Sequence, residues 1–494
     1  MSQEKEPLNE NKNHHWLIGY AITVNSVVGA GVLGIPWGYQ KTGWTLGIFS
    51  QVFATSLSFL LLYLLLQSFS RMEVLSNLAE KGYKIKPMSI SDLLKPIRKE
   101  DYIIKQDQGE EAESLIAESN LDPEIGNRRY DMCEMAHILL GKAHGQILMI
   151  MFVIASSASL IGYCTIFSSS LASIIPIIGS GTCNIYDDPE FGESCRFHYW
   201  IYLAIYASIV IPLAIVGLTE QTFFQIVSFI VRIVVMTTMI VTSLYSIFSD
   251  TELDDNGSIN SDATVFKPLN LGLCLPIVYM ATFFKSTIST TTQYVEDKAQ
   301  NIQKICLFAL FSMSFFFLLL GLIVPFATDE VEKMVTLNWR DYSAGDDSDG
   351  RSWWTYFIAY LIVILPAVDV LSAFPIIAIN LADNIMSLTY GNFGEKEIPE
   401  WTMTYYRLAI TVPPVLIAIV VYDLSFVSDI SGSLCLLGGG IYIPLFAMVT
   451  KRLVDKPSSY DIFFFSDRWA WAGLVISIVA FIAIWVLILI YFIS

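Results

Sequence analysis

Eleven long runs of mostly apolar residues divide this chain, and they constrain its fold more than any other feature. A helix needs about 20 apolar residues to cross a hydrocarbon core of about 30 Å, and only helices and closed barrels satisfy every backbone group there. Only 15% of the 494 residues are charged, against about a quarter in soluble domains. We therefore expect an all-α integral membrane protein with about 11 transmembrane helices. The runs cover residues 16–38, 43–67, 145–177, 200–217, 221–247, 270–294, 302–326, 353–388, 404–421, 424–448 and 468–493.

The basic residues lie mostly on one side of these runs. With the N-terminus placed in the cytosol, only six of the 29 Lys and Arg residues fall in outer loops, and basic residues near spans normally stay cytosolic. We therefore predict a multi-pass topology with a cytosolic tail over residues 1–15. The polar stretch over residues 67–146 is predicted to be a largely disordered cytosolic loop that ends in a short amphipathic segment. Within it, EAESLI at residues 111–116 is either an acidic dileucine sorting signal or plain solvated loop.

Two features of the outer loops bear on their compartment. Cys183 and Cys195 share one outer loop, where they form either a disulfide or two free thiols, and the disulfide is favoured. Asn256 begins the glycosylation sequence Asn-Gly-Ser in another outer loop. The chain has a net charge of −17, and no basic patch suggests a nucleic-acid partner.

The chain carries no recognisable catalytic motif. None of the five histidines lies in an apolar run, and no H-E-x-x-H sequence or Cys/His spacing indicates a metal site. The phosphate-binding sequence G-x-x-x-x-G-K-[ST] and the hydrolase sequence G-x-S-x-G are also missing. We therefore expect no enzymatic activity, no cofactor and no metal.

The first run contains GAGVLG at residues 29–34, which matches the dinucleotide fingerprint G-x-G-x-x-G. It lacks the preceding strand and the acidic residue about 20 positions later that this fingerprint needs. The glycines therefore serve either close helix packing or a break in the helix. The sixth run is also interrupted, by Pro276 and the polar sequence KSTISTTTQ. Breaks at equivalent places in two five-helix halves are typical of transporters with inverted repeats.

Three segments resemble the amino acid/auxin permease family. NSVVGAGVLGIPWGYQKTGWTLG, from residue 25 to residue 47, is similar to the family's first helix and following loop, with its Asn, Gly-rich break, Ile-Pro pair and Gly-Trp. Residues 130–145 resemble the amphipathic lead into helix 3, and residues 423–449 resemble helix 10. The resemblance covers most of the chain. It implies secondary transport of amino acids by alternating access, with membrane lipid around the protein.

The resemblance also implies the leucine-transporter fold, with two inverted five-helix repeats, broken helices 1 and 6, and an appended helix 11. On this chain the units would be residues 16–247 with the cytosolic loop 68–144, residues 270–448, and residues 468–493.

In that fold the substrate lies between the two broken helices. The N–H groups of the half-helix that begins near Val32 would bind a substrate carboxylate. Carbonyl groups around residues 26–29, and near Ala281 and Thr282, would bind the substrate ammonium. Tyr163 would either close the pocket from outside or simply pack. The substrate-binding residues implied are Asn25, Ser26, Val28, Gly29, Ala30, Gly31, Val32, Tyr163, Ala281, Thr282 and Phe283.

Arg232 lies near the middle of the fifth run and Asp369 about midway along the eighth, and each is surrounded by apolar residues. A charge at the bilayer centre costs roughly 2.5 to 3.5 kcal/mol, so each should face the bundle interior and have a partner. They form either a structural ion pair or a coupling site, where Arg232 replaces the cation that sodium-coupled relatives hold near Ser372. Lys285 is a rival partner for Asp369. Our hypothesis is proton coupling through Asp369 rather than sodium coupling, which suits a lysosomal or vacuolar membrane, with the plasma membrane as the alternative.

A sensor of the same fold is the alternative function. Such a protein would bind an amino acid and signal through the cytosolic loop without transporting it. Uptake into proteoliposomes distinguishes the two, since a sensor gives no saturable flux.

Overall fold

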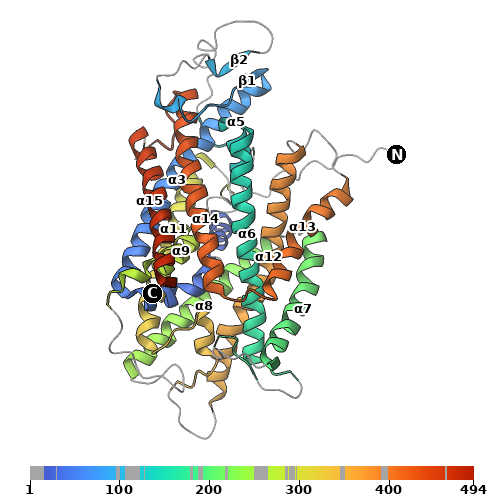
Figure 1. Ribbon diagram of the computed structural model, residues 1–494, viewed down its shortest axis with the longest axis vertical. Coiled ribbons are helices and arrows are strands. Elements are labelled where there is room, and N and C mark those ends of the chain that lie inside the picture. The colour runs from blue at the N-terminus through green and yellow to red at the C-terminus, as the bar shows by residue number, and fades with distance from the viewer. Residues whose placement is uncertain are drawn as a thin grey trace.

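The computed structural model describes residues 16–28, 30–95, 101–105, 123–126, 128, 130–177, 182–186, 193–216, 221–249, 265–283, 288, 295, 298–344, 351–390, 399–461, 464 and 466–493. Thirteen α-helices lie within these residues, and the long ones run roughly parallel to the long axis of the molecule (Figure 1). They are α1 (Trp16–Val27), α2 (Ile35–Thr42), α3 (Trp44–Glu80), α5 (Met132–Leu140), α6 (Lys142–Ile174), α7 (Glu193–Val216), α8 (Gln221–Ser249), α9 (Leu271–Thr282), α11 (Lys298–Ala327), α12 (Trp353–Tyr390), α13 (Glu400–Ala418), α14 (Leu424–Leu453) and α15 (Asp467–Ile493).

Eight of these helices are long and apolar enough to cross a membrane, namely α3, α6, α7, α8, α11, α12, α14 and α15. The first and sixth predicted spans contain the short apolar helices α1 and α9, with 12 residues each. The ninth predicted span contains α13, which has 19 residues but is not among the eight. The prediction of an all-helical membrane protein is therefore confirmed, with eight long apolar candidate spans among the described residues. The number of eleven transmembrane helices stays a prediction.

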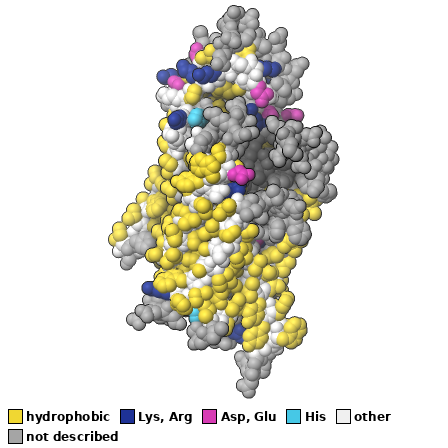
Figure 2. Space-filling model, turned by 90° about the vertical axis from the view of Figure 1, so that its right-hand side faces the viewer, with side chains coloured by type: hydrophobic (Ala, Val, Ile, Leu, Met, Phe, Trp, Pro, Cys, Tyr) yellow, Lys and Arg dark blue, Asp and Glu magenta, His cyan; other side chains and the backbone are white. Residues whose placement is uncertain are grey.

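Two long helices, α6 and α14, run side by side through the bundle and contact most of the others. Small residues of α14 let it approach its neighbours α9 and α15 closely, which is how helices associate in lipid. A side chain at Gly432 of α14 would overlap the carbonyl group of Pro276 in α9, and one at Gly440 would overlap Ser477 in α15. The outer surface is a broad band of hydrophobic side chains on the face that Figure 2 shows. This band is where lipid would surround the bundle.

One end of the bundle, which we call the hairpin end, carries a two-stranded antiparallel ribbon (Figure 1). Strand β1 (Tyr83–Ile85) pairs with β2 (Ile103–Lys105), and the 3-10 helix η2 (Asp92–Leu94) lies between them. Helix α3 runs to Glu80, well past the predicted end of the second span at residue 67. The prediction of a largely disordered loop was therefore wrong for these residues.

Contacts with the long helices hold this ribbon in place. Arg452 at the end of α14 donates hydrogen bonds to the carbonyl groups of Leu93 and Asp92, at 2.5 and 3.3 Å. The predicted amphipathic segment is α5, whose residues Met135 and Leu139 are fully buried. The EAESLI sequence lies outside the described residues.

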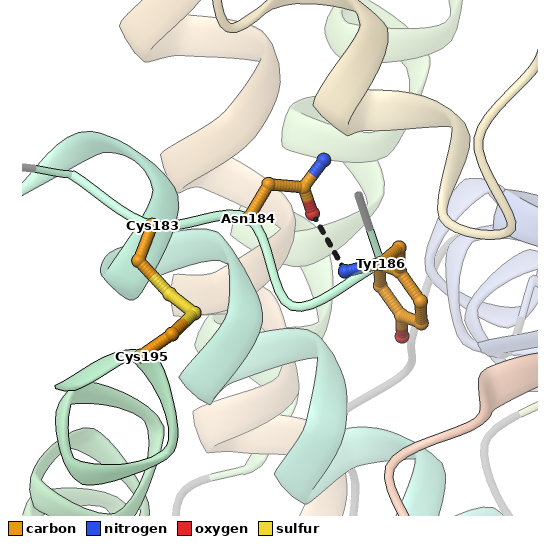
Figure 3. Close-up of a disulfide and its surroundings, with 4 residues drawn as sticks. All are labelled: Cys183, Asn184, Tyr186 and Cys195. Carbon is orange, nitrogen blue, oxygen red and sulfur yellow. Dashed lines mark hydrogen bonds between the residues drawn. A yellow bond between two sulfur atoms is a disulfide. The ribbon is translucent and has the colours of Figure 1, made fainter. Parts of the chain in front are cut away.

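The opposite end, which we call the disulfide end, carries the connections from α6 to α7 and from α13 to α14. The predicted disulfide between Cys183 and Cys195 is present and joins the segment after α6 to the start of α7, with the two Cα atoms 5.6 Å apart (Figure 3). Asn184 turns the chain after Cys183, because its Oδ1 accepts a hydrogen bond from the Tyr186 amide at 3.1 Å. Tyr186 in turn donates to the carbonyl group of Tyr422, next to α14. Asn256 lies outside the described residues.

Candidate functional site

The first predicted span is interrupted in its middle. Helix α1 ends at Val27, the 3-10 helix η1 (Ala30–Gly34) follows, and α2 begins at Ile35. The half-helix therefore begins three residues later than the predicted start near Val32. Pro36 explains this start, since proline fits the first turn of a helix, where its missing N–H has no partner in any case.

The end of α9 lies against this interruption. A Cβ atom added at Gly31 in η1 would be 3.3 Å from the carbonyl oxygen of Ile277 and 3.5 Å from the amide nitrogen of Ala281. Helix α9 ends at Thr282, whose Oγ1 hydrogen-bonds back to the carbonyl group of Tyr279 at 3.1 Å. The two helix ends therefore meet inside the bundle, and glycine at position 31 permits the close approach.

Arg232 of α8 connects the interrupted helix to α12. Its Nε atom lies 2.7 Å from Oδ2 of Asp369, and its Nη1 atom donates to the carbonyl oxygens of Asn25 and Val28, at 2.6 and 2.5 Å. Both charged side chains are about nine-tenths buried. One guanidinium group therefore neutralises a buried carboxylate and also binds carbonyl groups on both sides of the end of α1.

Two polar contacts support this ion pair. The Asn25 side-chain amide donates to the backbone carbonyl and to Oε1 of Gln225 in α8, at 2.5 and 2.7 Å. Ser372 of α12 bonds to the carbonyl group of Asp369 at 2.8 Å, and its Oγ lies 3.1 Å from Oγ of Ser228. Helices α1, α8 and α12 are thus joined at one level by hydrogen bonds.

A small cavity of about 50 Å³ lies beside the ion pair. Tyr163 of α6, which is only 5% exposed, lines it together with Val28 and Val32. Arg232 and Asp369 supply its charged wall, and the remaining lining residues are aliphatic: Leu33, Ile166, Val231, Val235, Met236, Pro366 and Val370. Among the described residues, no three His, Cys, Asp or Glu side chains gather as metal ligands.

Phe283 follows α9 and lies on the side facing α14. Its ring packs against Gly439, where an added Cβ atom would overlap it, and its centroid is 5.8 Å from that of Tyr279. Gly29 and Lys285 lie outside the described residues, as do the side chains of Ser26 and Ala30. Asp369 has Arg232 as its partner, and its pairing with Lys285 lies beyond the described residues.

Sequence reasoning missed Gln225 and Ser228 as partners of the predicted site residues. Both are uncharged residues of an otherwise ordinary span. The available signal was their spacing, because positions 225, 228 and 232 lie three and four residues apart and therefore share one face of α8. That face turns toward Asn25, Ser372 and Asp369.

Comparisons with known proteins place the chain among transporters and transmembrane proteins of similar sequence. The chain matches the family described as "Transmembrane amino acid transporter protein" over residues 12–84 and 114–491. Transmembrane protein 104 of Gallus gallus is 23% identical over 462 residues, which cover 88% of this chain and 87% of that protein. Transmembrane protein 104 of Homo sapiens is 24% identical over 463 residues, with the same coverage. Amino acid transporter AVT3A of Arabidopsis thaliana is 45% identical over 52 residues, which are 10% of this chain and 12% of that protein.

Proposed function

Because the chain belongs to the transmembrane amino acid transporter family, we propose that it moves amino acids across a membrane as a secondary active transporter with alternating access. The observation that carries this proposal is the meeting of the two helix ends, where Gly31 lies against Ile277 and Ala281. Helix ends inside a membrane bundle leave backbone groups free to bind an ionic substrate, which is how such transporters form their sites. The local match to AVT3A, whose name gives it as an amino acid transporter, supports the same function.

The substrate binds between the two helix ends. Its carboxylate takes the N–H groups of the segment from Ala30 to Val32, which the positive end of α2 favours. Its ammonium takes carbonyl groups near the ends of α1 and α9 that Arg232 leaves free. Tyr163 closes the pocket on the α6 side, and Phe283 borders it on the α14 side.

The helices follow the order of two inverted five-helix repeats, residues 16–247 and 270–448, with α15 as the appended helix. The hairpin end faces the cytosol, because the loop over residues 67–146 at this end carries 11 of the 29 Lys and Arg residues, and basic residues near spans stay cytosolic. The disulfide end faces outward or into an acidic organelle. A disulfide on that side supports this orientation.

Transport does not need sodium. The family resemblance implies that sodium-coupled relatives hold a cation between carbonyl groups of helix 1 and helix 8. In this chain the guanidinium group of Arg232 has the corresponding contacts, with the carbonyl groups of Asn25 and Val28 on one side and the carboxylate of Asp369 on the other. An arginine remains charged at any accessible pH, so it acts as a fixed cation. The driving ion is then a proton.

Uptake by purified protein in liposomes tests the proposal. We expect saturable uptake of at least one amino acid from a radiolabelled panel, unchanged when choline replaces sodium and increased when the disulfide-end side is made acidic. Gly31→Leu should abolish it while the protein still inserts and folds, because the side chain would enter the contact with Ile277. Gly438→Leu is the matched control, since an added Cβ atom there has only ordinary contacts, the nearest at 3.4 Å.

Two outcomes would contradict parts of the proposal. Binding without saturable flux would identify a sensor of the same fold. Uptake that stops in choline and ignores the pH gradient would remove the fixed-cation role of Arg232.

A further inference from the structure

Helix α14 carries a buried carboxylate that takes no part in the site described above. Asp429 lies in the second turn of α14, near the disulfide end, and is only 8% exposed. Its Oδ1 atom is buried and has no hydrogen-bond partner. Asp423, at the start of the same helix, is different, because Lys333 binds its Oδ2 at 2.5 Å and it caps α14 by accepting from the Ser425 amide.

A buried carboxylate without a cation or a donor is costly, by several kcal/mol, because it has lost its water and gained nothing in return. Binding a proton removes most of this cost. Asp369 is not in this position, since Arg232 already neutralises it. Asp429 therefore differs from Asp369 in having no counter-ion, and this favours its protonated form.

The ionisable groups around Asp429 do not supply a counter-ion. Asp423, at the start of the same helix, has a like charge and repels the ionised form of Asp429. The thiol of Cys274 in α9 is close enough to interact with Asp429 electrostatically but carries no positive charge. Tyr39 of α2 is a neighbour of Cys274 and is also uncharged. Helix α6 meets this part of α14 through an uncharged contact, Ser159 to Ser431 at 3.1 Å. Within the described residues, no Lys or Arg side chain acts on Asp429.

Asp429 faces the contact between α14 and α9. Gly432, one turn further along α14, lies so close to Pro276 that an added Cβ atom would overlap the Pro276 carbonyl group. Cys274 is two residues before Pro276, and Gly31 of the broken helix touches Ile277, the next residue of α9. The carboxylate is therefore dry only while α14, α9 and η1 are packed together.

Resting on the proposed transport function, we propose that Asp429 is the proton-binding site that couples proton movement to closure of the disulfide end. When α14 and α9 separate, water reaches the carboxylate and it exchanges its proton with the solution at that end. When they pack, the carboxylate must hold one proton on an oxygen, so that the group is neutral. Each closure of the disulfide end thus takes up one proton from the solution on that side and holds it on Asp429.

The test is uptake by Asp429→Asn in liposomes with and without an imposed pH gradient. One coupled proton gives up to about tenfold accumulation for a gradient of one pH unit. We expect wild type to show this stimulation and Asp429→Asn to lose it, while exchange of labelled for unlabelled substrate continues, because the amide imitates the neutral acid. Asp467→Asn, which removes a carboxylate bound to Lys451 at the hairpin end, is the matched control and should keep the stimulation.

The outcomes separate the two proposals. Wild type without uptake would overturn the proposed transport function itself. Normal uptake with full pH stimulation in Asp429→Asn would overturn only the role of Asp429. If Asp429→Asn does not fold, Asp429→Glu decides the matter by infrared difference spectroscopy, because the carbonyl band of a buried protonated carboxyl group must then change position. A band that stays where it is in Asp429→Glu would overturn the inference.

Discussion

Two buried Arg–Asp ion pairs lie in the described part of the chain, and their surroundings differ. Arg71 of α3 binds Asp461 at 2.5 Å near the hairpin end, and Arg232 of α8 binds Asp369 at 2.7 Å beside the end of α1. All four side chains are at least nine-tenths buried. Both pairs also join segments that are far apart in the sequence, so burial and distance alone do not tell them apart.

Their remaining hydrogen bonds do distinguish them. The second contact of Arg71 goes to the carbonyl group of Gln67 in its own helix, and Asp461 accepts from the Ser458 amide in its own loop. This pair fastens the loop before α15 to α3. Arg232 instead binds two carbonyl groups on another helix, at the point where that helix stops, and a cavity lies next to it. The first pair therefore has only a structural role among its contacts, whereas the second lies beside the substrate site proposed above.

The largest effect should come from removing each arginine. In Arg232→Met and Arg71→Met, an aspartate is left buried and unpaired, which costs about 3 to 5 kcal/mol of folding free energy in either case. We expect uptake per folded molecule to fall more than about a hundredfold in Arg232→Met only, because this variant also loses the bonds that hold the end of α1. A hundredfold loss corresponds to about 3 kcal/mol. The measurement is uptake divided by the amount of monodisperse protein. Equal uptake per folded molecule in both variants would remove the distinction.

Lysine at the same positions should sharpen the comparison. Arg71→Lys keeps the ion pair with Asp461 and loses one long contact, so stability should fall by about 1 kcal/mol. Arg232→Lys cannot hold Asp369 and both carbonyl groups in the same planar arrangement, so uptake should fall about tenfold. Thermal unfolding followed by intrinsic fluorescence, together with uptake, measures both. Full transport by Arg232→Lys would show that a point charge is enough.

Two glutamines give a smaller effect of the same kind. Gln225 accepts from Asn25 beside the second pair, and Gln67 donates to the carbonyl groups of Tyr460 and Phe464 beside the first. Losing such a bond costs only about 0.5 to 1 kcal/mol, and Asn25 keeps its bond to the backbone carbonyl of residue 225 in either case. We expect Gln225→Leu to raise the KM for substrate several-fold and Gln67→Leu to lower only the Tm. The opposite pattern would assign the substrate-related role to the hairpin-end pair.

The smallest effect concerns Asp341, which is about one-third exposed and binds both Arg340, at 2.6 Å, and Arg351, at 2.8 Å. Burial alone would raise the pKa of Asp341, but hydrogen bonds and charge from the two guanidinium groups outweigh it and lower the pKa below its usual 3.8. The ionised form is therefore favoured in the folded protein, so this pairing stabilises it above about pH 4 and is lost as the pH falls through the lower, folded-state pKa. Solvent screening limits the gain to less than about 1 kcal/mol. Asp341→Asn should lower the Tm slightly at pH 7, and by progressively less as the pH falls below about 4. A difference in Tm that does not shrink toward low pH would contradict the pairing.

The sequence predicts the helical class and the place of the first break because both follow from local composition. Apolar length identifies the spans, and Gly31 with Pro36 marks the interruption. It also predicts that Arg232 and Asp369 need partners, since each charge stands alone among apolar residues. It cannot reveal that Gln225 reaches Asn25, because that contact depends on how α8 is rotated against α1, which only packing decides.

Two features of the structure could not be predicted from the sequence, for different reasons. The ribbon of β1 and β2 lies in a stretch with a polar, loop-like composition, and it is ordered by contacts from outside, such as Arg452 to Leu93. Asp429 was inside the segment that resembles helix 10, near its start, where an acidic residue normally favours the positive end of a helix. Its burial against α9 is a property of the assembled bundle.

Helix α14 is a single rod between the two ends of the protein. Its 30 residues span about 45 Å, with the unpaired Asp429 in the second turn and Arg452 gripping the ribbon in the last. Pro444 lies inside this helix, and an internal proline is a usual place for a helix to bend. A tilt of α14 at the disulfide end would therefore either shift η2, through its bonds to Arg452, or be taken up by a bend at Pro444. A fluorescent label beside η2 would distinguish the two, because its signal changes with movement at the disulfide end only if α14 moves as one piece.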